Sequence, residues 1–391
     1  MHRLLPDHLS NLPAPSADAA AHSARVGALI RRNIDAAGGW ISFARFMDLA
    51  LHAPGLGYYS AGMRKFGADG DFVTAPELGS LFGAVLARQA AQVLRAGIPQ
   101  IIECGAGSGR LARDLLRALH ELDCLPQRYC ILETSADLRA RQQTLIARDL
   151  PQIASRVSWL DAMPAAIEAL VIANEVLDAM PVHLVSARAD GIDEVGVVAA
   201  ADGRFAWLAR PAAGALLEAA RVLPIAPGCT TEIGLAAAAF TRTLAGSLRR
   251  GAAILIDYGF PAREYYHPQR SEGTLMCHYR HHAHADPLCL IGLQDITAHV
   301  DFSAIAGAAA AGGCTLLGYA GQAQFLINCG ITDVLAATPA ENTAAYLPLA
   351  SQAQKLLSPA EMGELFKVIA FGRGLDTELA GFSRGDRRHA L

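Results

Sequence analysis

Short apolar runs alternate with amphipathic stretches through the middle of this chain. The runs are rich in apolar and β-branched residues, which is typical of strands buried on both faces of a sheet. Four such strands are predicted here: Ile101–Cys104, Tyr129–Glu133, Val157–Leu160 and Ala169–Ala173. Residues 111–122 and 138–148 repeat their apolar positions with a helical period. Strands joined by helices predict an α/β fold with a mostly parallel sheet covered on both faces.

Later in the chain the pattern changes to shorter strands and longer irregular stretches. Three of these strands are expected at 182–187, 194–199 and 205–208. Asp202-Gly203 is expected as a hairpin turn, and residues 251–257 as a fifth parallel strand. Residues 258–301 are irregular and dense in His, Tyr, Arg and Pro, which predicts a functional loop or a lid. A last strand is expected at 366–371.

The same pattern suggests a division of the chain into parts. The expected parts are a disordered N-terminus (1–22), a helical cap region (23–97), an α/β domain (98–375) with insertions at about 182–232 and 258–301, and a basic, solvated tail (376–391). In the helical region, Thr74 is expected to cap a helix that runs to about Leu94. Glu77, three residues after Thr74, has the spacing of a capping box.

Composition and charge narrow the class of protein. The 391 residues are 52% hydrophobic and 18% charged, so the chain can bury a large core and is not mainly disordered. The net charge of −4 gives no electrostatic case for binding nucleic acid. No run approaches the ~18 apolar residues that a membrane-spanning helix needs. No membrane insertion is therefore expected.

The cysteines and the N-terminus predict a reducing compartment. None of the eight cysteines forms a Cys-x-x-Cys pair, and several lie in apolar runs, so reduced, buried thiols are expected. The first residues lack the apolar segment of a signal peptide, which favours the cytoplasm of a bacterium. The histidines at 278, 281, 282 and 284 have no recognised metal-ligand spacing, so no metal site is expected.

One stretch carries the strongest chemical signal, the segment Glu103-Cys-Gly105-Ala-Gly107-Ser-Gly109 after the first predicted strand. Alternating glycines can adopt positive φ and let a ligand approach the backbone, and the following helix offers free N–H groups. Such a turn fits a dinucleotide, S-adenosylmethionine, or a purely structural role. The spacing is G-x-G-x-G, not the dinucleotide G-x-G-x-x-G, which favours S-adenosylmethionine. Glu133 could then bind the ribose hydroxyls, and Glu103 the ammonium group of this cofactor.

Polar residues also follow the third and fourth predicted strands. Asp161 is placed to contact an adenine amino group, although it could equally be a helix N-cap. Asn174 and Glu175 fall at the carboxyl end of a strand, where ligands of open α/β sheets bind. Burying such groups without partners costs several kcal/mol, so they are expected to face a ligand or a cleft. Helix capping by Asn174 alone is the alternative.

Several motifs in this order resemble those of the MidA family of class I methyltransferases, whose eukaryotic members are mitochondrial complex I assembly factors. The motifs are Glu103–Gly109, Gly70-Asp-Phe-Val-Thr-Ala-Pro-Glu77, Asn174-Glu-Val-Leu-Asp-Ala-Met-Pro181, Asp257-Tyr-Gly259, Gly273-Thr-Leu275 and Asp295–Phe302. The resemblance covers about residues 25–375. It implies a Rossmann-like fold, with a seven-stranded, mostly parallel sheet, an N-terminal helical cap and inserted β or irregular lid segments.

The resemblance also implies a function and a set of site residues. The family implies S-adenosylmethionine-dependent N-methylation, with symmetric dimethylation of an arginine on a complex I subunit in the eukaryotic members. The cofactor would be held by Glu103, Gly105, Gly107, Gly109, Glu133, Asp161 and Asn174. Asn174, Glu175 and Asp178 would border the transferred methyl group. Many members have aromatic residues where this chain has Val176-Leu177, so the shape of the acceptor pocket differs.

For an arginine acceptor, a carboxylate must orient the guanidinium group, because the high pKa of this group keeps it protonated. We expect Glu175 to be this clamp, with Asp178 or Asp71 as a second acid. Asp71 could instead be an ordinary turn residue.

Further substrate contacts are expected from Thr74, Asp257 and His299. Asp257 and His299 could equally be ordinary polar residues at strand ends.

The sequence leaves three functional hypotheses and an open oligomeric state. The first is a protein arginine methyltransferase acting on a protein partner. The second is a methyltransferase for a small molecule or another protein nitrogen. The third is an assembly chaperone that binds the cofactor and a partner without turnover. A homodimer is among the alternatives for the assembly.

Overall fold

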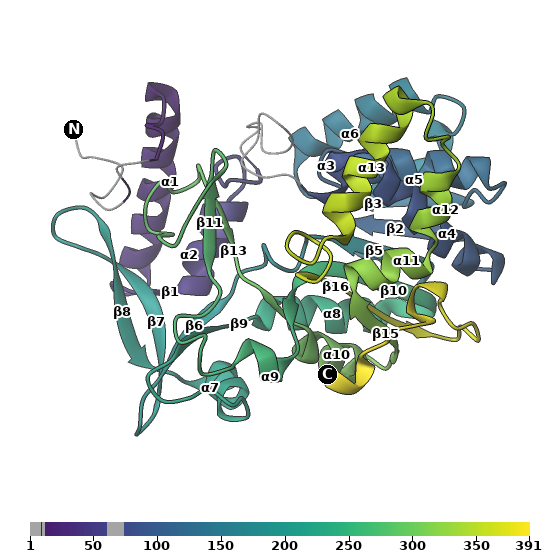
Figure 1. Ribbon diagram of the computed structural model, residues 1–391. Coiled ribbons are helices and arrows are strands. Elements are labelled where there is room, and N and C mark those ends of the chain that lie inside the picture. Colours follow the sequence, from purple (N-terminus) through teal and green to yellow (C-terminus); the bar gives the residue numbers. More distant parts are fainter. Residues whose placement is uncertain (1–8, 10–11, 61–73) are drawn as a thin grey trace. The chain divides into compact units, whose positions relative to one another are not determined.

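The computed structural model describes residues 9, 12–60 and 74–391 (Figure 1). The chain forms two compact units, each assembled from separate segments. Unit 1 consists of residues 1–72, 177–237 and 262–301, and unit 2 of residues 73–176, 238–261 and 302–391. The expected helical cap region is therefore divided, since its first helices belong to unit 1 and its last to unit 2.

Unit 2 is built on a mixed sheet with the strand order β15-β16-β10-β5-β2-β3-β4. These strands are β2 (Gln100–Cys104), β3 (Arg128–Leu132), β4 (Val157–Leu160), β5 (Ile167–Asn174), β10 (Leu248–Phe260), β15 (Thr315–Gly321) and β16 (Phe366–Arg373). The two-residue β14 (Val300–Asp301) pairs with β10 and makes the sheet eight-stranded. The predicted α/β fold is confirmed, but the sheet is eight-stranded and mixed.

The directions of the strands determine which edge can hold a ligand. Strands β4, β3, β2, β5 and β10 are parallel, whereas β16 is antiparallel to both β10 and β15. Strand β15 consequently runs in the same direction as β10. The carboxyl ends of all the strands in the sheet path except β16 therefore meet at one edge. In open α/β sheets this is the edge at which ligands bind.

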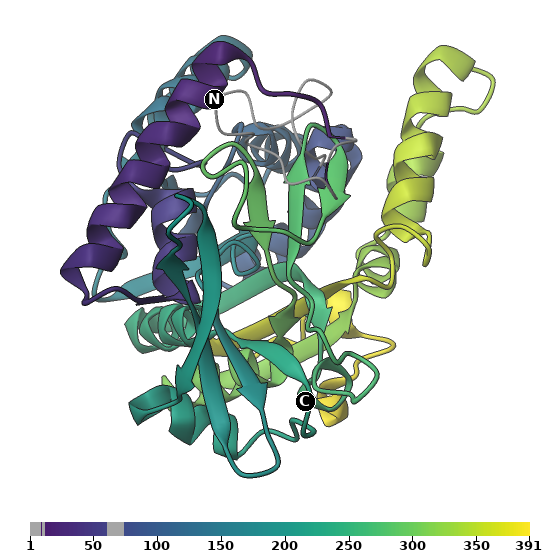
Figure 2. The same cartoon turned by 90° about the vertical axis from the view of Figure 1, so that its left-hand side faces the viewer.

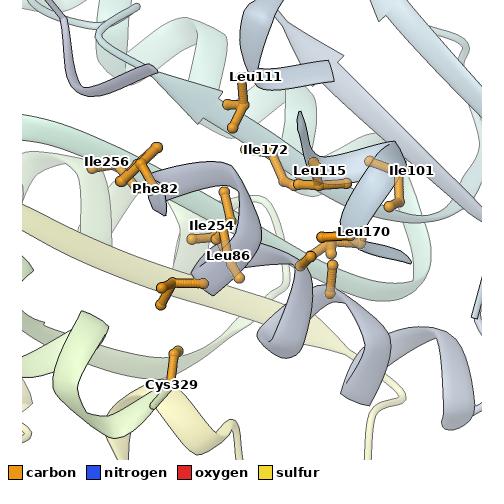
Figure 3. Packing of buried hydrophobic residues seen from close by; sticks show 14 of the residues in the cluster. Phe82, Leu86, Ile101, Leu111, Leu115, Leu170, Ile172, Ile254, Ile256 and Cys329 are labelled. Atoms are coloured by element: carbon orange, nitrogen blue, oxygen red, sulfur yellow. The ribbon is translucent and has the colours of Figure 1, made fainter. Parts of the chain in front are cut away.

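Helices pack on this sheet through apolar faces. The helices of this unit are α3 (Ala75–Leu78), α4 (Leu81–Arg95), α5 (Arg110–Glu121), α6 (Ala136–Asp149), α8 (Leu235–Ser247, which leads in from unit 1), α10 (Phe302–Ala311), α11 (Gln322–Asn328), α12 (Ile331–Ala336) and α13 (Thr343–Leu357). Figure 3 shows Phe82 and Leu86 of α4 in one buried cluster with Ile172 of β5 and Ile254 of β10. Residues at every second strand position share this face, as the pleat requires. In Figure 2, α13 rises from unit 2 with its first residues exposed.

The predicted helix from Thr74 to about Leu94 is two helices. Gly79 between α3 and α4 has φ 151°, which ends the first helix. The Leu81 N–H at the start of α4 donates to Gln352 Oε1 of α13 at 3.2 Å. Thr74 occupies the N-cap position of α3, but its side chain makes no capping hydrogen bond, and the Glu77 carboxylate contacts another part of the unit. The capping-box prediction is therefore wrong.

The C-terminal segment is docked on unit 2, in contrast to the expected solvated tail. Phe382 is buried and packs against Phe325 of α11, with the rings tilted and their centroids 5.3 Å apart. The Arg387 N–H donates to the Tyr319 carbonyl of β15 at 2.6 Å, and Asp386 accepts from the Tyr319 N–H at 3.2 Å. The segment thus covers the outer edge of β15, which would otherwise present unpaired backbone groups.

Unit 1 contains two small antiparallel sheets with helices. Its elements are α1 (Ala17–Ala36), β1 (Ile41–Ser42), α2 (Phe43–His52), β6 (His183–Ala187), β7 (Ile192–Ala199), β8 (Phe205–Pro211), α7 (Gly214–Arg221), β9 (Thr230–Ile233), α9 (Ala262–Tyr265), β11 (Met276–Tyr279), β12 (His282–His284) and β13 (Asp295–Thr297). One sheet has the order β1-β7-β6-β9 with β8 paired to β7, and the other the order β12-β11-β13. Residues 258–301, expected to be irregular, therefore include a three-stranded sheet.

Helix α1 begins inside the segment that was expected to be disordered. The Ser16 hydroxyl accepts a hydrogen bond from the Ala19 N–H at 3.2 Å, and Asp18 lies in the first turn. A capped, acidic first turn stabilises a helix start and explains the difference. Among the described residues, no helix is both long and apolar enough to cross a membrane.

The docked C-terminal segment leads to a stability prediction. Phe382→Ala should lower the free energy of unfolding of unit 2 by about 3–5 kcal/mol, because it empties a buried aromatic site. The matched control is Arg387→Ala, which removes an exposed side chain and leaves its backbone bond to Tyr319 in place. Urea unfolding of the purified variants measures both. Equal stability of the two variants would contradict the docking.

Candidate functional site

The glycine turn after β2 has the backbone that its sequence predicts. Gly105, Gly107 and Gly109 have φ values of 66°, 51° and 83°, the left-handed region in which side chains are disfavoured. A Cβ on Gly105 would also lie 2.9 Å from Cγ2 of Val176, so the turn and the end of β5 are in close contact. Gly109 is the N-cap of α5, whose first N–H groups therefore point to the ligand edge of the sheet.

Glu103, the acid before the turn, lies inside unit 2 with 2% of its surface exposed. Its Oε2 atom accepts a hydrogen bond from the Tyr129 hydroxyl at 2.7 Å. The pKa of Glu103 is raised to about 7, mainly by burial; the Tyr129 hydrogen bond lowers this pKa and the negative charge of Glu133 raises it. A cation near these two acids would favour the ionised form of Glu103.

Glu133 belongs to a buried group of hydrogen-bonded residues that includes Ser135 and Gln142. Its Oε1 atom accepts from the Ser135 N–H at 2.9 Å, and its Oε2 atom from Nε2 of Gln142 at 3.1 Å. The same Gln142 nitrogen donates to the carbonyl of Gly107 at 2.9 Å. The Trp159 indole donates to Gln142 Oε1 at 2.9 Å. The predicted ribose acid and the glycine turn are thus connected through one amide.

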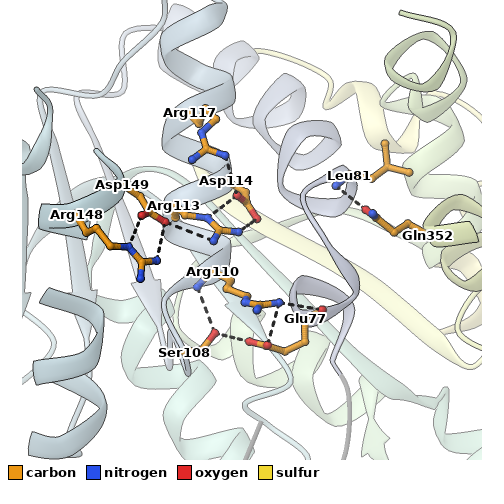
Figure 4. Close-up of polar contacts among 10 residues, drawn as sticks. All are labelled: Glu77, Leu81, Ser108, Arg110, Arg113, Asp114, Arg117, Arg148, Asp149 and Gln352. Carbon is orange, nitrogen blue, oxygen red and sulfur yellow. Dashed lines mark hydrogen bonds and ion pairs between the residues drawn. The ribbon is translucent and has the colours of Figure 1, made fainter. Parts of the chain in front are cut away.

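A second connection joins the turn to α3, as Figure 4 shows. The Ser108 hydroxyl donates to the Glu77 carboxylate. Arg110 donates from Nη1 to the Glu77 carbonyl at 3.1 Å, and the same nitrogen lies 3.4 Å from Glu77 Oε2. The Glu77 side chain is only 5% exposed, so this pair is shielded from water on one side. The contacts hold the start of α5 against α3.

The end of β5 carries the most strained residue of the site. Glu175 has φ 53°, an uncommon conformation for a residue with a side chain. It is held by the Glu175 N–H, which donates to the Ile256 carbonyl at 2.9 Å, and by the Val176 N–H, which donates to Asp257 Oδ2 at 3.2 Å. Asn174 Nδ2 donates to Glu175 Oε1 at 2.9 Å. Such strain is frequent at functional sites, where the neighbouring contacts maintain it.

The remaining predicted residues of unit 2 lie in different surroundings. Asp161 is 91% exposed and pairs with Arg139 at 2.8 Å. Thr74 is buried at the start of α3, and its carbonyl accepts from the Glu77 N–H at 2.9 Å. Asp257 is buried, and its two carboxylate oxygens accept the N–H groups of Val176 and Tyr258. Asp257 therefore orients the backbone after Glu175. Asp71 lies outside the described residues.

Two predicted residues belong to unit 1. Asp178 is buried, and its carbonyl accepts from the Ala298 N–H at 3.1 Å. The His299 N–H donates to Thr274 Oγ1 at 3.0 Å.

Near Asp178 in unit 1, the Tyr59 hydroxyl donates to the buried Asp295 carboxylate at 2.8 Å. Burial, followed by the charges of Asp295 and Asp178, raises the pKa of Tyr59 well above its usual range. Within the described parts of the chain, no group of three or more His, Cys, Asp or Glu residues could hold a metal ion.

Comparison with known proteins identifies the class of this α/β protein. A family model described as an S-adenosyl-L-methionine-dependent methyltransferase, Methyltransf_28, matches residues 85–320. The match covers the glycine turn, the end of β5 and the strands between them. The chain belongs to this family of methyltransferases, and the resemblance to MidA proteins is confirmed.

Relatives of this chain cover most of its length. A protein from Burkholderia thailandensis, whose crystal structure contains bound S-adenosyl-homocysteine, is 52% identical in sequence to this chain. The two structures superpose with a TM-score of 0.94, and the match covers 97% of this chain and 100% of that one. The mitochondrial protein arginine methyltransferase NDUFAF7 homolog of Drosophila melanogaster is 29% identical over 378 residues, 86% of this chain and 82% of that protein. The Caenorhabditis elegans homolog is 28% identical over 297 residues, 68% of this chain and 67% of that protein.

S-adenosyl-L-methionine is therefore the cofactor, as the glycine spacing predicts, and the residues at the ligand edge fit it. The positive φ values of the turn leave its backbone open to close approach, and the start of α5 favours a carboxylate. Glu133 suits two ribose hydroxyls. The Oδ1 atom of Asn174 is buried and has no hydrogen-bond partner among the described residues, so it suits a donor such as an ammonium group.

Two residues of this site were missed by the sequence reasoning. Gln142 follows Leu138 and precedes Ile146 at a spacing of four, so it is the polar member of the buried stripe of α6. A polar residue within an apolar stripe is a detectable signal. Glu77 has the spacing of a capping residue, and only the fold brings it to Ser108. No local pattern could have assigned that contact.

The burial of Glu103 leads to a pH prediction for the protein without ligand. The pKa of Glu103 rises from 4.5 to about 7 on folding. At pH values between these two, Glu103 is therefore protonated in the folded state and ionised in the unfolded state. The free energy of unfolding should then fall as the pH rises through this window, by about 3 kcal/mol in total. In Glu103→Gln this fall should be absent.

Urea unfolding at pH 5, 6, 7 and 8 measures this dependence. Glu121→Gln, at an exposed position on α5, is the matched control and should keep the wild-type slope. Parallel slopes for the wild type and Glu103→Gln would show that Glu103 ionises normally.

Proposed function

We propose that this methyltransferase transfers methyl groups to an arginine side chain of a protein. The observation that carries the proposal is Glu175, a carboxylate held in a strained conformation at the carboxyl end of β5, beside the glycine turn. The names of the animal relatives, protein arginine methyltransferases at 27–29% identity, support this acceptor. Symmetric dimethylation, with a respiratory complex I subunit as the partner, is the specific form proposed.

Methyl transfer to an arginine nitrogen depends, at its start, more on the positioning of the two reactants than on proton transfer. When bound, S-adenosylmethionine supplies an electrophilic methyl group on a sulfonium. An arginine has to present a nitrogen lone pair, although the high pKa of its guanidinium group keeps it protonated. A carboxylate that accepts two guanidinium N–H groups fixes the plane of the group and withdraws its positive charge from the attacking nitrogen. Holding reactants in line contributes most of the acceleration in such a displacement.

The contacts of Glu175 suit this role. Asn174 donates to Oε1 of Glu175 and so fixes the orientation of the carboxylate. Asp257 fixes the next backbone N–H, that of Val176, so the strained residue cannot relax easily. In the proposal Asp178, three residues further along the chain, is the second acid. Asp257 is a positioning residue, because both of its oxygens accept backbone N–H groups.

Glu175→Gln tests the role of the carboxylate. The variant keeps the shape and one carbonyl oxygen but loses the charge, so kcat/KM for the protein acceptor should fall by about 100-fold or more. The dissociation constant for S-adenosyl-homocysteine, measured by calorimetry, should stay within about threefold, because the glutamine oxygen can still accept the hydrogen bond from Asn174 Nδ2. Glu168→Gln, at the exposed second position of β5, is the matched control and should retain full activity.

The acceptor itself is identified by labelling. Purified protein is incubated with S-adenosylmethionine carrying a labelled methyl group and with lysate of cells that lack this protein, and labelled peptides are mapped by mass spectrometry. Label on arginine supports the proposal. Label confined to small metabolites, or to other protein nitrogens, contradicts it. If Glu175→Gln abolishes labelling but restores complex I activity in such cells, the protein acts as an assembly chaperone.

A further inference from the structure

Gln142 is a buried amide that contacts three parts of the cofactor edge. Its residue surface is 0% exposed, and it lies on α6 between the glycine turn, β3 and β4. Its Nε2 atom donates to the Gly107 carbonyl at 2.9 Å and to Glu133 Oε2 at 3.1 Å. Its Oε1 atom accepts from Trp159 Nε1 at 2.9 Å. Both ends of the amide are therefore engaged.

The chemistry of the partners permits only one orientation of this amide. An indole N–H can only donate, so the oxygen of Gln142 has to face Trp159. A backbone carbonyl and an ionised carboxylate can only accept, so the nitrogen has to face Gly107 and Glu133. A flipped amide would put two acceptors against each other in a dry site, which is costly. Trp159 thus determines where the two N–H groups point.

This fixed amide determines the geometry of the residues that contact the ligand. Glu133 is held at both oxygens, by Gln142 and by the Ser135 N–H, so the plane of its carboxylate is set. Each oxygen of an ionised carboxylate can accept more than one hydrogen bond, so this does not prevent binding to hydroxyl groups. The Gly107 carbonyl is held by the same amide. A Cβ on Gly109 would lie 3.1 Å from Cγ of Gln142, so the side chain also packs against the turn.

We propose that Gln142 is a positioning residue of the cofactor site, which aims the Glu133 carboxylate at the ribose hydroxyls of the cofactor. Trp159 acts through it by selecting the orientation of the amide. The inference rests on the cofactor and not on the identity of the methyl acceptor. It can therefore fail or succeed independently of arginine methylation.

The test compares two ligands that differ only at the ribose. The dissociation constants of S-adenosyl-homocysteine and of its 2′,3′-dideoxy analogue are measured by calorimetry for each variant. Gln142→Met keeps the volume of the side chain and removes all three hydrogen bonds. It should weaken S-adenosyl-homocysteine by about 10–100-fold, as expected for the loss of bonds to a charged group. The dideoxy analogue should change by less than about threefold, since it makes no hydroxyl contact with Glu133.

The controls separate positioning from a merely structural role. Gln143→Met, at the exposed neighbouring position of α6, should leave both constants unchanged. Trp159→Phe removes the donor that orients the amide while keeping an aromatic ring, and should reproduce the ribose-dependent loss at a smaller size, about 3–10-fold. It also serves as the test if Gln142→Met does not fold. Equal weakening of both ligands, or lower melting temperature with unchanged binding, would overturn the proposal.

Discussion

The carboxylates at the ligand edge of the unit 2 sheet are buried away from water, so the protein itself has to supply their hydrogen-bond donors. Glu103, Glu133 and Asp257 are all buried, and each accepts hydrogen bonds from a different source: a tyrosine hydroxyl, a side-chain amide with a backbone N–H, and two backbone N–H groups. An unpaired buried charge would cost several kcal/mol, so these donors are as necessary to the fold as the apolar core beneath them. Because the donors come from separate elements, these hydrogen bonds link β2, β3, α6 and β10 at the ligand edge.

The same requirement explains how a rigid site can be made from short loops. The glycine turn is fastened from one side by Glu77, through Ser108 and Arg110, and from the other by Gln142. Strained Glu175 is maintained by Asn174, Ile256 and Asp257. In each case another group of the protein, a side chain or a backbone carbonyl, replaces the water that an exposed loop would bind. Cofactor binding can then use groups that are already oriented, which reduces the entropy lost on binding.

The local pattern of residues predicts the structure correctly where that structure depends on neighbours in the chain. The strands Ile101–Cys104 and Val157–Leu160, the positive φ of the three glycines and the cofactor all follow from neighbouring residues. The local pattern is wrong or silent where the answer depends on residues distant in the chain. The antiparallel direction of β16, the separation of α3 from α4 at Gly79, and the docking of Phe382 are set by contacts with remote elements. Of the candidate site residues, Glu103, Glu133, Asn174 and Glu175 lie at the ligand edge of unit 2, whereas Asp161 is exposed and paired with Arg139.

The position of β16 has a consequence for how the protein is made. This strand lies between β10 and β15, yet both leave the ribosome before it does. Until β16 has been synthesised, β10 and β15 of the growing chain therefore each have an unpaired strand edge. Long-range pairing of this kind is slow, and exposed edges pair readily with those of other chains. The nascent protein is thus vulnerable to aggregation until β16 closes the sheet.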